Sequence, residues 1–339
     1  MNTTVTLEAI REARARIATH IHRTPVLTCA SLDRMAGAQL FFKCENLQKT
    51  GSFKIRGATN AVLSLDEAEA TRGVVTHSSG NHAAALARAA SQRGIPSWIV
   101  MPSNAPKAKV RAVEGYGGQV TFCEPTIASR ESTAAQIIER IGAVMIHPYN
   151  NDRIIAGQGT AALELLEEVP GLDVVMAPVS GGGLLSGTAI ASKAMRPQAR
   201  VIGAEPKNAD DAYRSLQSGK LEPLAQAHTM ADGLRAGLCE RTLGILRERV
   251  DEIVVVTEEE IVAAMRHVWE RMKIIVEPSS AVAFAAVLKS PAAAGKHVGI
   301  LLSGGNVDLE QLPFAAATGE PRSKLVARAH GAACDRGES

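Results

Sequence analysis

The sequence lacks the compositional features of nucleic-acid-binding and membrane-surface proteins. Aromatic residues make up only 3% of its 339 residues, which leaves few stacking platforms for single-stranded nucleic acid. Neither sign of charge dominates, because 37 basic residues stand against 35 acidic ones and leave a net charge of +2. We therefore expect no nucleic-acid partner and no polybasic membrane surface.

Paired cysteines and long apolar runs are also missing. The five cysteines include no Cys-x-x-Cys pair, which argues against a zinc cluster or a disulfide framework and favours a reducing cytosol. No apolar run approaches the ~18 residues that a membrane helix needs, and the first ten residues carry an acid and no apolar core. We therefore expect a cytoplasmic protein with neither a membrane span nor a signal peptide.

Short apolar runs alternate with amphipathic segments along most of the chain. Strands separated by helices of about a dozen residues are typical of right-handed βαβ units and a parallel sheet. An extended piece is expected to start at 24–27, and the expected strands are 40–45, 74–76, 97–101, 119–122, 144–146, 174–178, 199–204, 252–256 and 297–302. The expected helices are 7–22, 58–63, 81–94, 105–116, 129–141, 155–169, 184–195, 210–218, 258–272 and 279–289. We expect a large domain from residues 1–69 and 147–318, a small domain from residues 70–146, and a polar, frayed tail at 319–339.

Lys54 stands in the stretch Lys49–Ala58, directly after an aromatic residue and close to the expected start of a helix. An amine that is partly screened from water there has a lowered pKa and becomes a candidate nucleophile toward a carbonyl. Most lysines near helix starts are ordinary surface residues, so this assignment depends on the other motifs.

Three consecutive glycines, Gly181 to Gly183, follow Ser180 between a buried strand and a helix. Backbone N–H groups that converge at a helix N-terminus can hold a phosphate without a charged side chain. The alternative is a plain strand-to-helix turn. The loop is neither a nucleotide P-loop nor a dinucleotide fingerprint, because it lacks Gly-Lys-Ser/Thr and the Gly-x-Gly-x-x-Gly order.

Two further loops complete a pattern. Ser78, Ser79 and Asn81 place polar donors at an expected helix start, where they suit a carboxylate or simply cap the helix. Ser303 follows the last strand and offers a neutral partner for a ring nitrogen, or forms another tight turn. A lysine, a phosphate loop, a carboxylate loop and a ring-nitrogen partner are together what pyridoxal phosphate requires.

These motifs resemble those of the fold-type II pyridoxal-phosphate enzymes, in the group of serine/threonine dehydratases, serine racemase and threo-3-hydroxyaspartate dehydratase. The matching stretches run in family order: Lys49–Ala58, Thr76–His82, His147-Pro148 with Ile155–Thr160, Ser180–Gly187, Glu205–Asp211 and Ser303–Asp308. The resemblance implies a tryptophan-synthase-β-like α/β fold with two open, twisted, mostly parallel sheets and flanking helices.

The resemblance also implies roles for the residues of the site. Lys54 would form the Schiff base, Phe53 would pack against the cofactor ring, and Ser303 would bond the pyridine nitrogen. The remaining cofactor-binding residues are Asn81, at the 3-hydroxyl, and the phosphate loop Ser180, Gly181, Gly182, Gly183 and Leu184. The substrate carboxylate would bind at Ser78, Ser79, Gly80 and Asn81. Ser180 stands where the family usually has a fourth glycine; its hydroxyl can contact phosphate, but its Cβ disfavours a positive φ.

The expected activity is that of an ammonia-lyase acting on L-serine, L-threonine or 3-hydroxyaspartate. Lys54 would remove the Cα proton, and loss of the β-hydroxyl as water would lead to a 2-oxo acid and ammonia. One alternative is a serine racemase with side β-elimination, in which Ser79 returns a proton to the other face of Cα. A second is a dedicated threo-3-hydroxyaspartate ammonia-lyase, with Arg130 or Arg235 for the extra carboxylate, although either arginine can equally be solvated. A non-enzymatic phosphate-ligand binding module is the remaining class.

The resemblance further implies a metal ion and a partner subunit. Glu205, Asp211 and the carbonyl of Ala209 are hard oxygen ligands suited to Mg²⁺, or to Ca²⁺ or Mn²⁺; the alternative is a solvated acidic helix start. A homodimer is implied. The nucleotide site of the racemase branch is matched by Lys49, Thr50, Tyr116, Lys273 and Asn306. Ala84 stands where the animal racemases have glutamine, which counts against activation by ATP.

Overall fold

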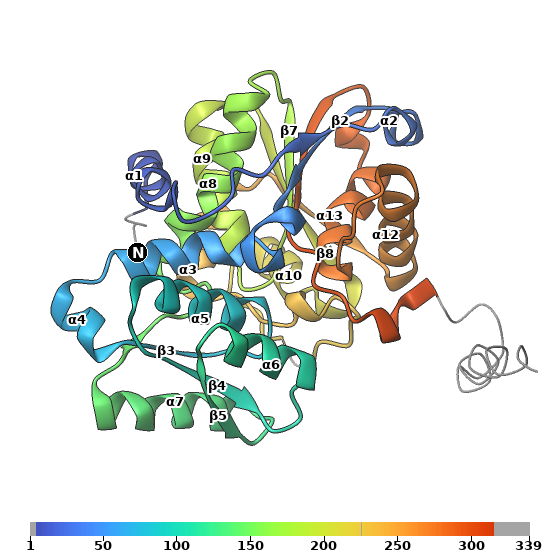
Figure 1. The fold of residues 1–339 in the computed structure, drawn as a ribbon. Coiled ribbons are helices and arrows are strands. Elements are labelled where there is room, and N and C mark those ends of the chain that lie inside the picture. Colours follow the sequence, from blue (N-terminus) through green and yellow to red (C-terminus); the bar gives the residue numbers. More distant parts are fainter. Residues whose placement is uncertain (1–4, 225, 315–339) are drawn as a thin grey trace, which may run out of the picture. The chain divides into compact units, whose positions relative to one another are not determined.

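Two mostly parallel β-sheets organise the chain (Figure 1). The structure is a computed structural model and describes residues 5–224 and 226–314. The larger sheet has six strands in the order β1-β2-β10-β7-β8-β9, and the smaller has four in the order β5-β4-β3-β6. All neighbouring strands run parallel except β1, which is antiparallel to β2. The expected α/β class with two mostly parallel sheets is confirmed.

All nine predicted strands are present, each with bounds within two residues of the expectation, and the extended piece expected at 24–27 contains a short tenth strand. The strands are β1 Val26–Leu27, β2 Gln39–Cys44, β3 Val74–His77, β4 Ser97–Pro102, β5 Gln119–Cys123, β6 Val144–Met145, β7 Val174–Pro178, β8 Arg200–Pro206, β9 Glu252–Val256 and β10 His297–Leu302.

The helices agree less closely with the prediction. They are α1 Leu7–Ile17, α2 Ala30–Ala36, α3 Lys54–Leu63, α4 Glu67–Arg72, α5 Asn81–Arg93, α6 Lys107–Gly115, α7 Ile127–Ile141, α8 Asp152–Glu168, α9 Gly183–Met195, α10 Asp211–Ser218, α11 Glu240–Arg249, α12 Glu258–Met272 and α13 Pro278–Lys289. The short 3-10 helices are η1 Glu45–Leu47, η2 Lys49–Gly51, η3 Lys207–Ala209, η4 Asp232–Leu234, η5 Pro291–Ala293 and η6 Leu309–Gln311. Helices α2, α4 and α11 were not predicted, and the helix predicted over 7–22 ends at Ile17. Ile21 is nevertheless buried, so apolar spacing continues past the end of the helix.

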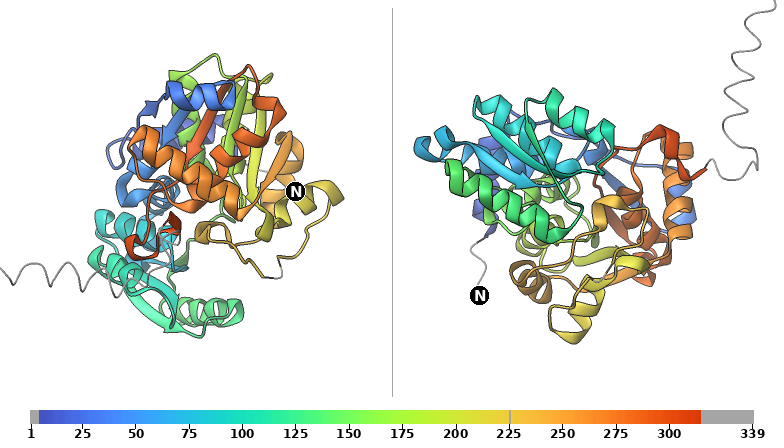
Figure 2. Two further views of the ribbon diagram at one scale, coloured as in Figure 1. Left: turned by 90° about the vertical axis from the view of Figure 1, so that its right-hand side faces the viewer. Right: turned by 90° about the horizontal axis from the view of Figure 1, so that it is seen from below.

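Helices cover both faces of each sheet. Helices α8 and α9 pack on one face of the larger sheet and α13 on the other, with α12 outside α13. Strand β7 is therefore buried along its whole length, as expected for a parallel strand covered on both sides. Helices α5 and α6 lie on one face of the smaller sheet and α7 on the other, as the view from below shows (Figure 2).

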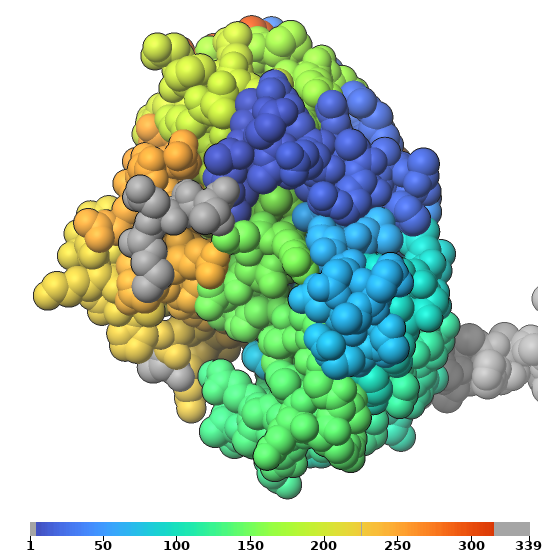
Figure 3. All heavy atoms as spheres, turned by 90° about the vertical axis from the view of Figure 1, so that its left-hand side faces the viewer, coloured from blue at the N-terminus to red at the C-terminus, as the bar shows by residue number. Residues whose placement is uncertain are grey.

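Helix α1 packs against α8 and α3. Three of its residues, Ile10, Ala13 and Ile17, are buried at helical spacing. In the surface view the dark blue residues of the N-terminal region border the green residues of the middle of the chain (Figure 3). This contact joins segments that are more than a hundred residues apart in the sequence.

The strands of the smaller sheet all fall within residues 70–146. The described residues up to Asn306 form one compact unit, and residues from Val307 belong to another; η6 lies among the described residues of that second unit. The predicted tail at 319–339 lies outside the described residues. Within the described part of the chain, no helix has the length and apolar character needed to cross a membrane.

Candidate active site

The stretch before α3 lies against the end of β10. The N–H of Phe53 donates to the carbonyl of Ser303 at 3.0 Å, and the N–H of Gly305 donates to the carbonyl of Gly51 at 2.9 Å. An isolated antiparallel bridge joins the residues between these hydrogen bonds. The main chain alone therefore places Lys54 close to Ser303, although the two are far apart in the sequence.

Lys54 is the first residue of α3, and its side chain is half-buried. Its Nζ donates to the carbonyl of Pro148 at 3.2 Å and lies 5.1 Å from the centroid of the Phe53 ring. Burial lowers the pKa of Lys54 to about 8, although the carboxylate of Glu277 acts in the opposite direction. A fraction of the amine is therefore unprotonated near neutral pH, as a nucleophile or a base requires.

The glycine loop joins β7 to α9. Gly182 is the N-cap of α9 with a φ of 87°, a left-handed conformation that favours glycine. A Cβ on Gly181 would come within 2.3 Å of the Tyr149 ring, and one on Gly182 within 2.7 Å of Thr242. Among the described residues, no side chain caps the N-terminus of α9. The loop thus offers uncapped N–H groups at a helix start, which fits an anionic group such as phosphate.

Ser180 occupies the first position of the loop without backbone strain. Among the described non-glycine residues, only Thr50 and Lys273 have a positive φ, so the conformation that disfavours serine is not required there. The hydroxyl of Ser180 bonds the backbone of Ala236. Leu184 is buried in the first turn of α9.

The polar loop Ser78–Asn81 leads from β3 into α5. Helix α5 begins at Asn81, and its N-cap is Gly80, which makes no side-chain capping bond. The Ser78 hydroxyl accepts only a long 3.4 Å contact from the N–H of Gly80. The alternative that a serine or Asn81 simply caps this helix is therefore wrong, and the loop retains donors for a ligand.

Glu277 is a site residue that the sequence reasoning missed. It is 3% exposed, accepts from Asn81 Nδ2 at 2.9 Å and from the N–H of Asn306 at 3.1 Å. Asn306 Nδ2 in turn donates to Asn81 Oδ1 at 2.9 Å. Burial raises the pKa of Glu277 to about 8, and Asp232 adds to the effect. The available signal was an acid directly before Pro278, where a helix starts within an otherwise apolar stretch.

Aromatic rings flank Pro148, whose carbonyl accepts the hydrogen bond from Lys54. His147 stacks edge-on with His77, with centroids 5.6 Å apart, and with Tyr149, with centroids 4.6 Å apart. His147 Nδ1 accepts the N–H of Asn150 at 3.0 Å, so the proton of the neutral ring lies on Nε2. Burial lowers the pKa of His147 to about 4, with further contributions from His77 and Lys54. The His147 ring is therefore neutral near pH 7.

The two candidate arginines lie in different settings. Arg130 is half-buried, its Nε is buried without a partner among the described residues, and its charge lowers the pKa of His77 after the larger effect of burial. Arg235 is exposed, and its Nε and Nη2 donate to the carbonyl of Thr229, at 3.0 and 2.5 Å. Arg130 thus lies near the aromatic rings, whereas Arg235 is held by its own loop.

The predicted metal ligands are buried carboxylates. Glu205 and Asp211 are 0% and 1% exposed, so the alternative of a solvated acidic helix start is wrong. Glu205 accepts the N–H groups of Ala212 and Tyr213 at 3.0 and 2.8 Å. Burial raises the pKa of Glu205 to about 9 and that of Asp211 to about 6. Within the described part of the chain, no group of three or more His, Cys, Asp or Glu residues forms a metal cluster; this site offers two carboxylates beside the buried Ala209.

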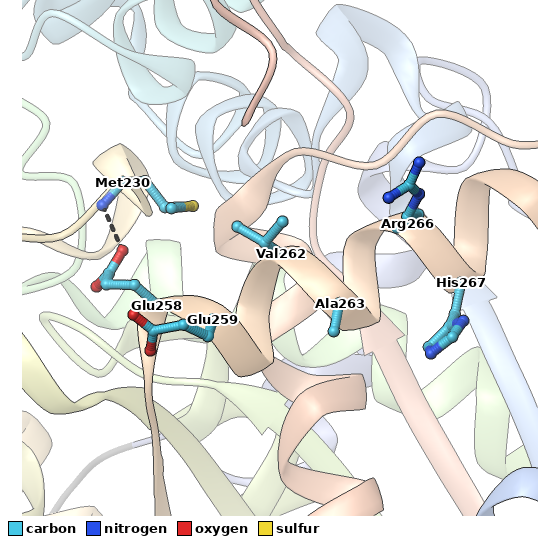
Figure 4. Close-up of a pocket in the computed structure, with 7 residues that line it drawn as sticks. All are labelled: Met230, Glu258, Glu259, Val262, Ala263, Arg266 and His267. Carbon is cyan, nitrogen blue, oxygen red and sulfur yellow. Dashed lines mark hydrogen bonds between the residues drawn. The ribbon is translucent and has the colours of Figure 1, made fainter. Parts of the chain in front are cut away.

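A surface cavity of about 430 Å³ lies along α12 (Figure 4). It is lined by Met230, Glu258, Glu259, Val262, Ala263, Arg266 and His267. Met230 N–H donates to Glu258 at 2.9 Å, across one end of it. None of the predicted site residues lines this cavity.

Comparison with known proteins gives the family of this chain. The sequence matches the family described as pyridoxal-phosphate dependent enzyme over residues 17–304. It is 54% identical to serine racemase of Arabidopsis thaliana over 310 residues, which cover 90% of this chain and 94% of that protein. It is 51% identical to beta-hydroxyaspartate dehydratase of Paracoccus denitrificans over 310 residues, which cover 91% of this chain and 98% of that protein. The fold is similar to the crystal structure of serine racemase from Dictyostelium discoideum, with a TM-score of 0.87, 52% identity and coverage of 91% of this chain and 100% of that one. The chain therefore belongs to the family of pyridoxal-phosphate dependent enzymes.

Proposed function

We propose that the protein is an ammonia-lyase that removes water and ammonia from a β-hydroxy amino acid and yields a 2-oxo acid. The observation that carries this proposal is the backbone junction between Phe53 and Ser303, which places a lysine of lowered pKa beside a neutral hydroxyl residue. Family membership supports it, as does the similarity to beta-hydroxyaspartate dehydratase.

The residues of the site fit pyridoxal phosphate. When bound, the cofactor supplies an aldehyde that condenses with amines and a ring that acidifies the Cα–H of an attached amino acid. Lys54 would hold the aldehyde carbon, and the glycine loop Ser180–Leu184 would hold the phosphate through its uncapped N–H groups. Asn81 would bond the 3-hydroxyl, Phe53 would pack on the ring, and Ser303 would bond the ring nitrogen.

Lys54 would also move the Cα proton. Its pKa of about 8 leaves a neutral amine available to accept that proton near neutral pH. Ser303 is neutral and would not keep a ring nitrogen protonated as an aspartate would. The ring would then withdraw fewer electrons from Cα, which favours prompt departure of the β-hydroxyl. The loop Ser78–Asn81 would bind the substrate carboxylate at the uncapped start of α5.

Serine racemisation is the second candidate function. It is favoured by the uncapped start of α5, which Ser79 shortly precedes, and by 54% identity to a serine racemase. Ser79 would return a proton to Cα from the side that Lys54 does not serve. We therefore propose Ser79 as a second catalytic residue whose loss separates racemisation from elimination.

A substrate with a second carboxylate, such as 3-hydroxyaspartate, would need a cation. Arg130 fits this role better than Arg235, because its buried Nε has no partner among the described residues and a bidentate guanidinium suits a carboxylate. Arg235 already donates twice to the Thr229 carbonyl. We propose Arg130 as the principal contact and Arg235 as the alternative.

Glu205, Asp211 and the carbonyl of Ala209 would bind Mg²⁺, or Ca²⁺ or Mn²⁺, in a structural role. The raised pKa values of the two buried carboxylates support this, because a divalent cation would offset the cost of burying them as anions.

The proposal extends to the organisation of the protein. Residues 70–146 would act as a small substrate-loop domain against a large cofactor domain made from residues 1–69 and 147–318. We propose a homodimer. We also propose a location in the reducing cytosol, which the four free cysteines among the described residues support. Activation by ATP is not part of the proposal, because Ala84 departs from the racemase pattern.

A substrate panel tests the function. Purified holoenzyme is assayed for 2-oxo acid and for D-serine with serine, threonine and the threo and erythro isomers of 3-hydroxyaspartate. We expect 2-oxo acid from at least one of them, and Lys54→Ala should abolish both the product and the borohydride-fixable cofactor. Ser79→Ala should remove D-serine formation while elimination from one enantiomer remains. Retention of full activity by Lys54→Ala would end the proposal.

A further inference from the structure

Ser180 makes two hydrogen bonds to a single residue of another segment. Its hydroxyl donates to the carbonyl of Ala236 at 2.8 Å and accepts the N–H of Ala236 at 3.0 Å. A serine hydroxyl has one hydrogen to donate, and that hydrogen is directed to Ala236. The Ser180 side chain is therefore not free to donate to a bound phosphate.

The segment that carries Ala236 is fixed at several other points. The N–H of Leu238 donates to Asp211 Oδ2 at 3.0 Å, and the N–H of Gly233 donates to Ser279 Oγ at 2.9 Å. The Leu238 side chain lies where a Cβ on Gly182 would come within 2.9 Å of it. The segment is thus a firm support that touches the glycine loop.

Among residues 180–183, only Ser180 makes a side-chain hydrogen bond. Gly181, Gly182 and Gly183 have no side chains, and glycine loses more conformational freedom on ordering than any other residue. Ser180 is the one position of the four with a side chain that can tie the loop to its surroundings. A loop that is ordered before the ligand arrives binds more tightly than one that must be ordered on binding.

We propose that Ser180 is a positioning residue that holds the glycine loop in its anion-binding form through the paired hydrogen bonds to Ala236. This rests on the proposed function of the loop as the phosphate site. Ser180 acts on the phosphate through the backbone of the loop and not through its hydroxyl.

The test compares Ser180→Ala and Ser180→Gly with Ser186→Ala. Ser186 is a buried serine of α9 whose hydroxyl has no partner among the described residues, so its replacement controls for the loss of a nearby hydroxyl. Hydrogen exchange at the Ala236 amide is measured on the protein with and without pyridoxal phosphate, along with the cofactor Kd and the kcat of the saturated enzyme.

Ser180→Ala should accelerate exchange at Ala236 about fivefold to tenfold in the cofactor-free protein, because the Ala236 amide loses the hydroxyl that accepts its hydrogen bond. The cofactor Kd should rise by a similar factor, more for Ser180→Gly, while kcat at saturation stays within about twofold. Ser186→Ala should change neither quantity. A rise in Kd with unchanged Ala236 exchange would overturn the proposal in favour of a direct hydroxyl contact to phosphate. Faster exchange with unchanged Kd would also overturn it, because the hydrogen bonds to Ala236 would then have no effect on cofactor binding. A failure of the function itself is distinguishable, because the wild-type protein would then neither bind the cofactor nor turn over an amino acid.

Discussion

Removal of the Arg56 guanidinium should destabilise the protein strongly, because it leaves buried carboxylates without their main cation. Arg56, Lys43 and Glu45 are 0% exposed and Glu164 is 4% exposed. Arg56 donates to Glu45 at 2.7 and 2.8 Å and to Glu164 at 2.8 and 2.9 Å, and Lys43 donates to Glu164 at 2.6 Å. Two cations and two carboxylates make a neutral cluster, and Arg56→Ala changes its charge to −1.

The magnitude follows from that imbalance. Breaking a buried ion pair by removing one partner costs about 3–5 kcal/mol, because the remaining charge is buried without compensation. Although burial alone would raise the pKa of Glu164, Arg56 and Lys43 hold it below its usual value. In the native protein Glu164 therefore stabilises the fold above its unfolded pKa of about 4.3 and loses that contribution as the pH falls. Without Arg56 its pKa should rise above the usual value, so the deficit should be largest at neutral pH and shrink toward pH 5.

Urea denaturation of the cofactor-free protein, followed by circular dichroism, measures the free energy of unfolding without a contribution from ligand binding. Arg11→Ala is the control, because its pair with Glu8 is exposed and should be worth less than about 0.5 kcal/mol. Adding Glu164→Gln to Arg56→Ala restores a neutral cluster and should recover at least about 1 kcal/mol. A loss below about 1 kcal/mol at neutral pH, or no recovery in the double variant, would refute the reasoning from unpaired charge.

Three further predictions concern the site. Because the pKa of Lys54 is lowered to about 8, the rate of cofactor reconstitution at low concentration should rise with pH through a midpoint near 8; a midpoint near the usual lysine value of about 10.4 would contradict the burial of this amine. Gly181→Ala should weaken cofactor binding at least tenfold in absorbance titrations, because the added Cβ meets the Tyr149 ring. Adding Tyr149→Ala should restore part of the affinity. A double variant that is equally impaired would exclude that collision as the cause. Chelation by EDTA should lower the Tm of the wild-type protein in calorimetry, because the two carboxylates would lose the cation that offsets their burial. The Tm of Asp211→Asn should not change on chelation. An equal shift in both proteins would place the metal elsewhere.

The sequence predicted the sheets well because a parallel strand covered on both faces is a short apolar run with punctuation at each end. Strand β7 is such a run, and its bounds agree with the prediction. Helix α2 has only seven residues and no side-chain N-cap, too few for an apolar period to be apparent. Helix α1 was predicted too long because Ile21 is buried after the helix has ended. The spacing of apolar residues indicates which side chains are buried and does not show where the helical hydrogen bonds stop.

The site was predictable where a loop type has a single chemical use, and less so where contacts join distant segments. Lys54 and the glycine loop were proposed from residue type, order and the resemblance to a known family. Glu277 was missed because a buried acid bonded to Asn81 and Asn306 looks in the sequence like any acid before a proline. The use of the Ser180 hydroxyl was equally invisible, since Ala236 offers only its backbone.

The junction between Phe53 and Ser303 has a consequence for how such a site can change. The two segments are joined by main-chain N–H and carbonyl groups, which every residue type except proline supplies. The side chain at position 303 can therefore be exchanged while the lysine keeps its place. An aspartate there would bring a carboxylate to a position where Ser303 is 3% exposed, so it would change the charge beside the lysine without removing the main-chain hydrogen bonds that hold the two segments together.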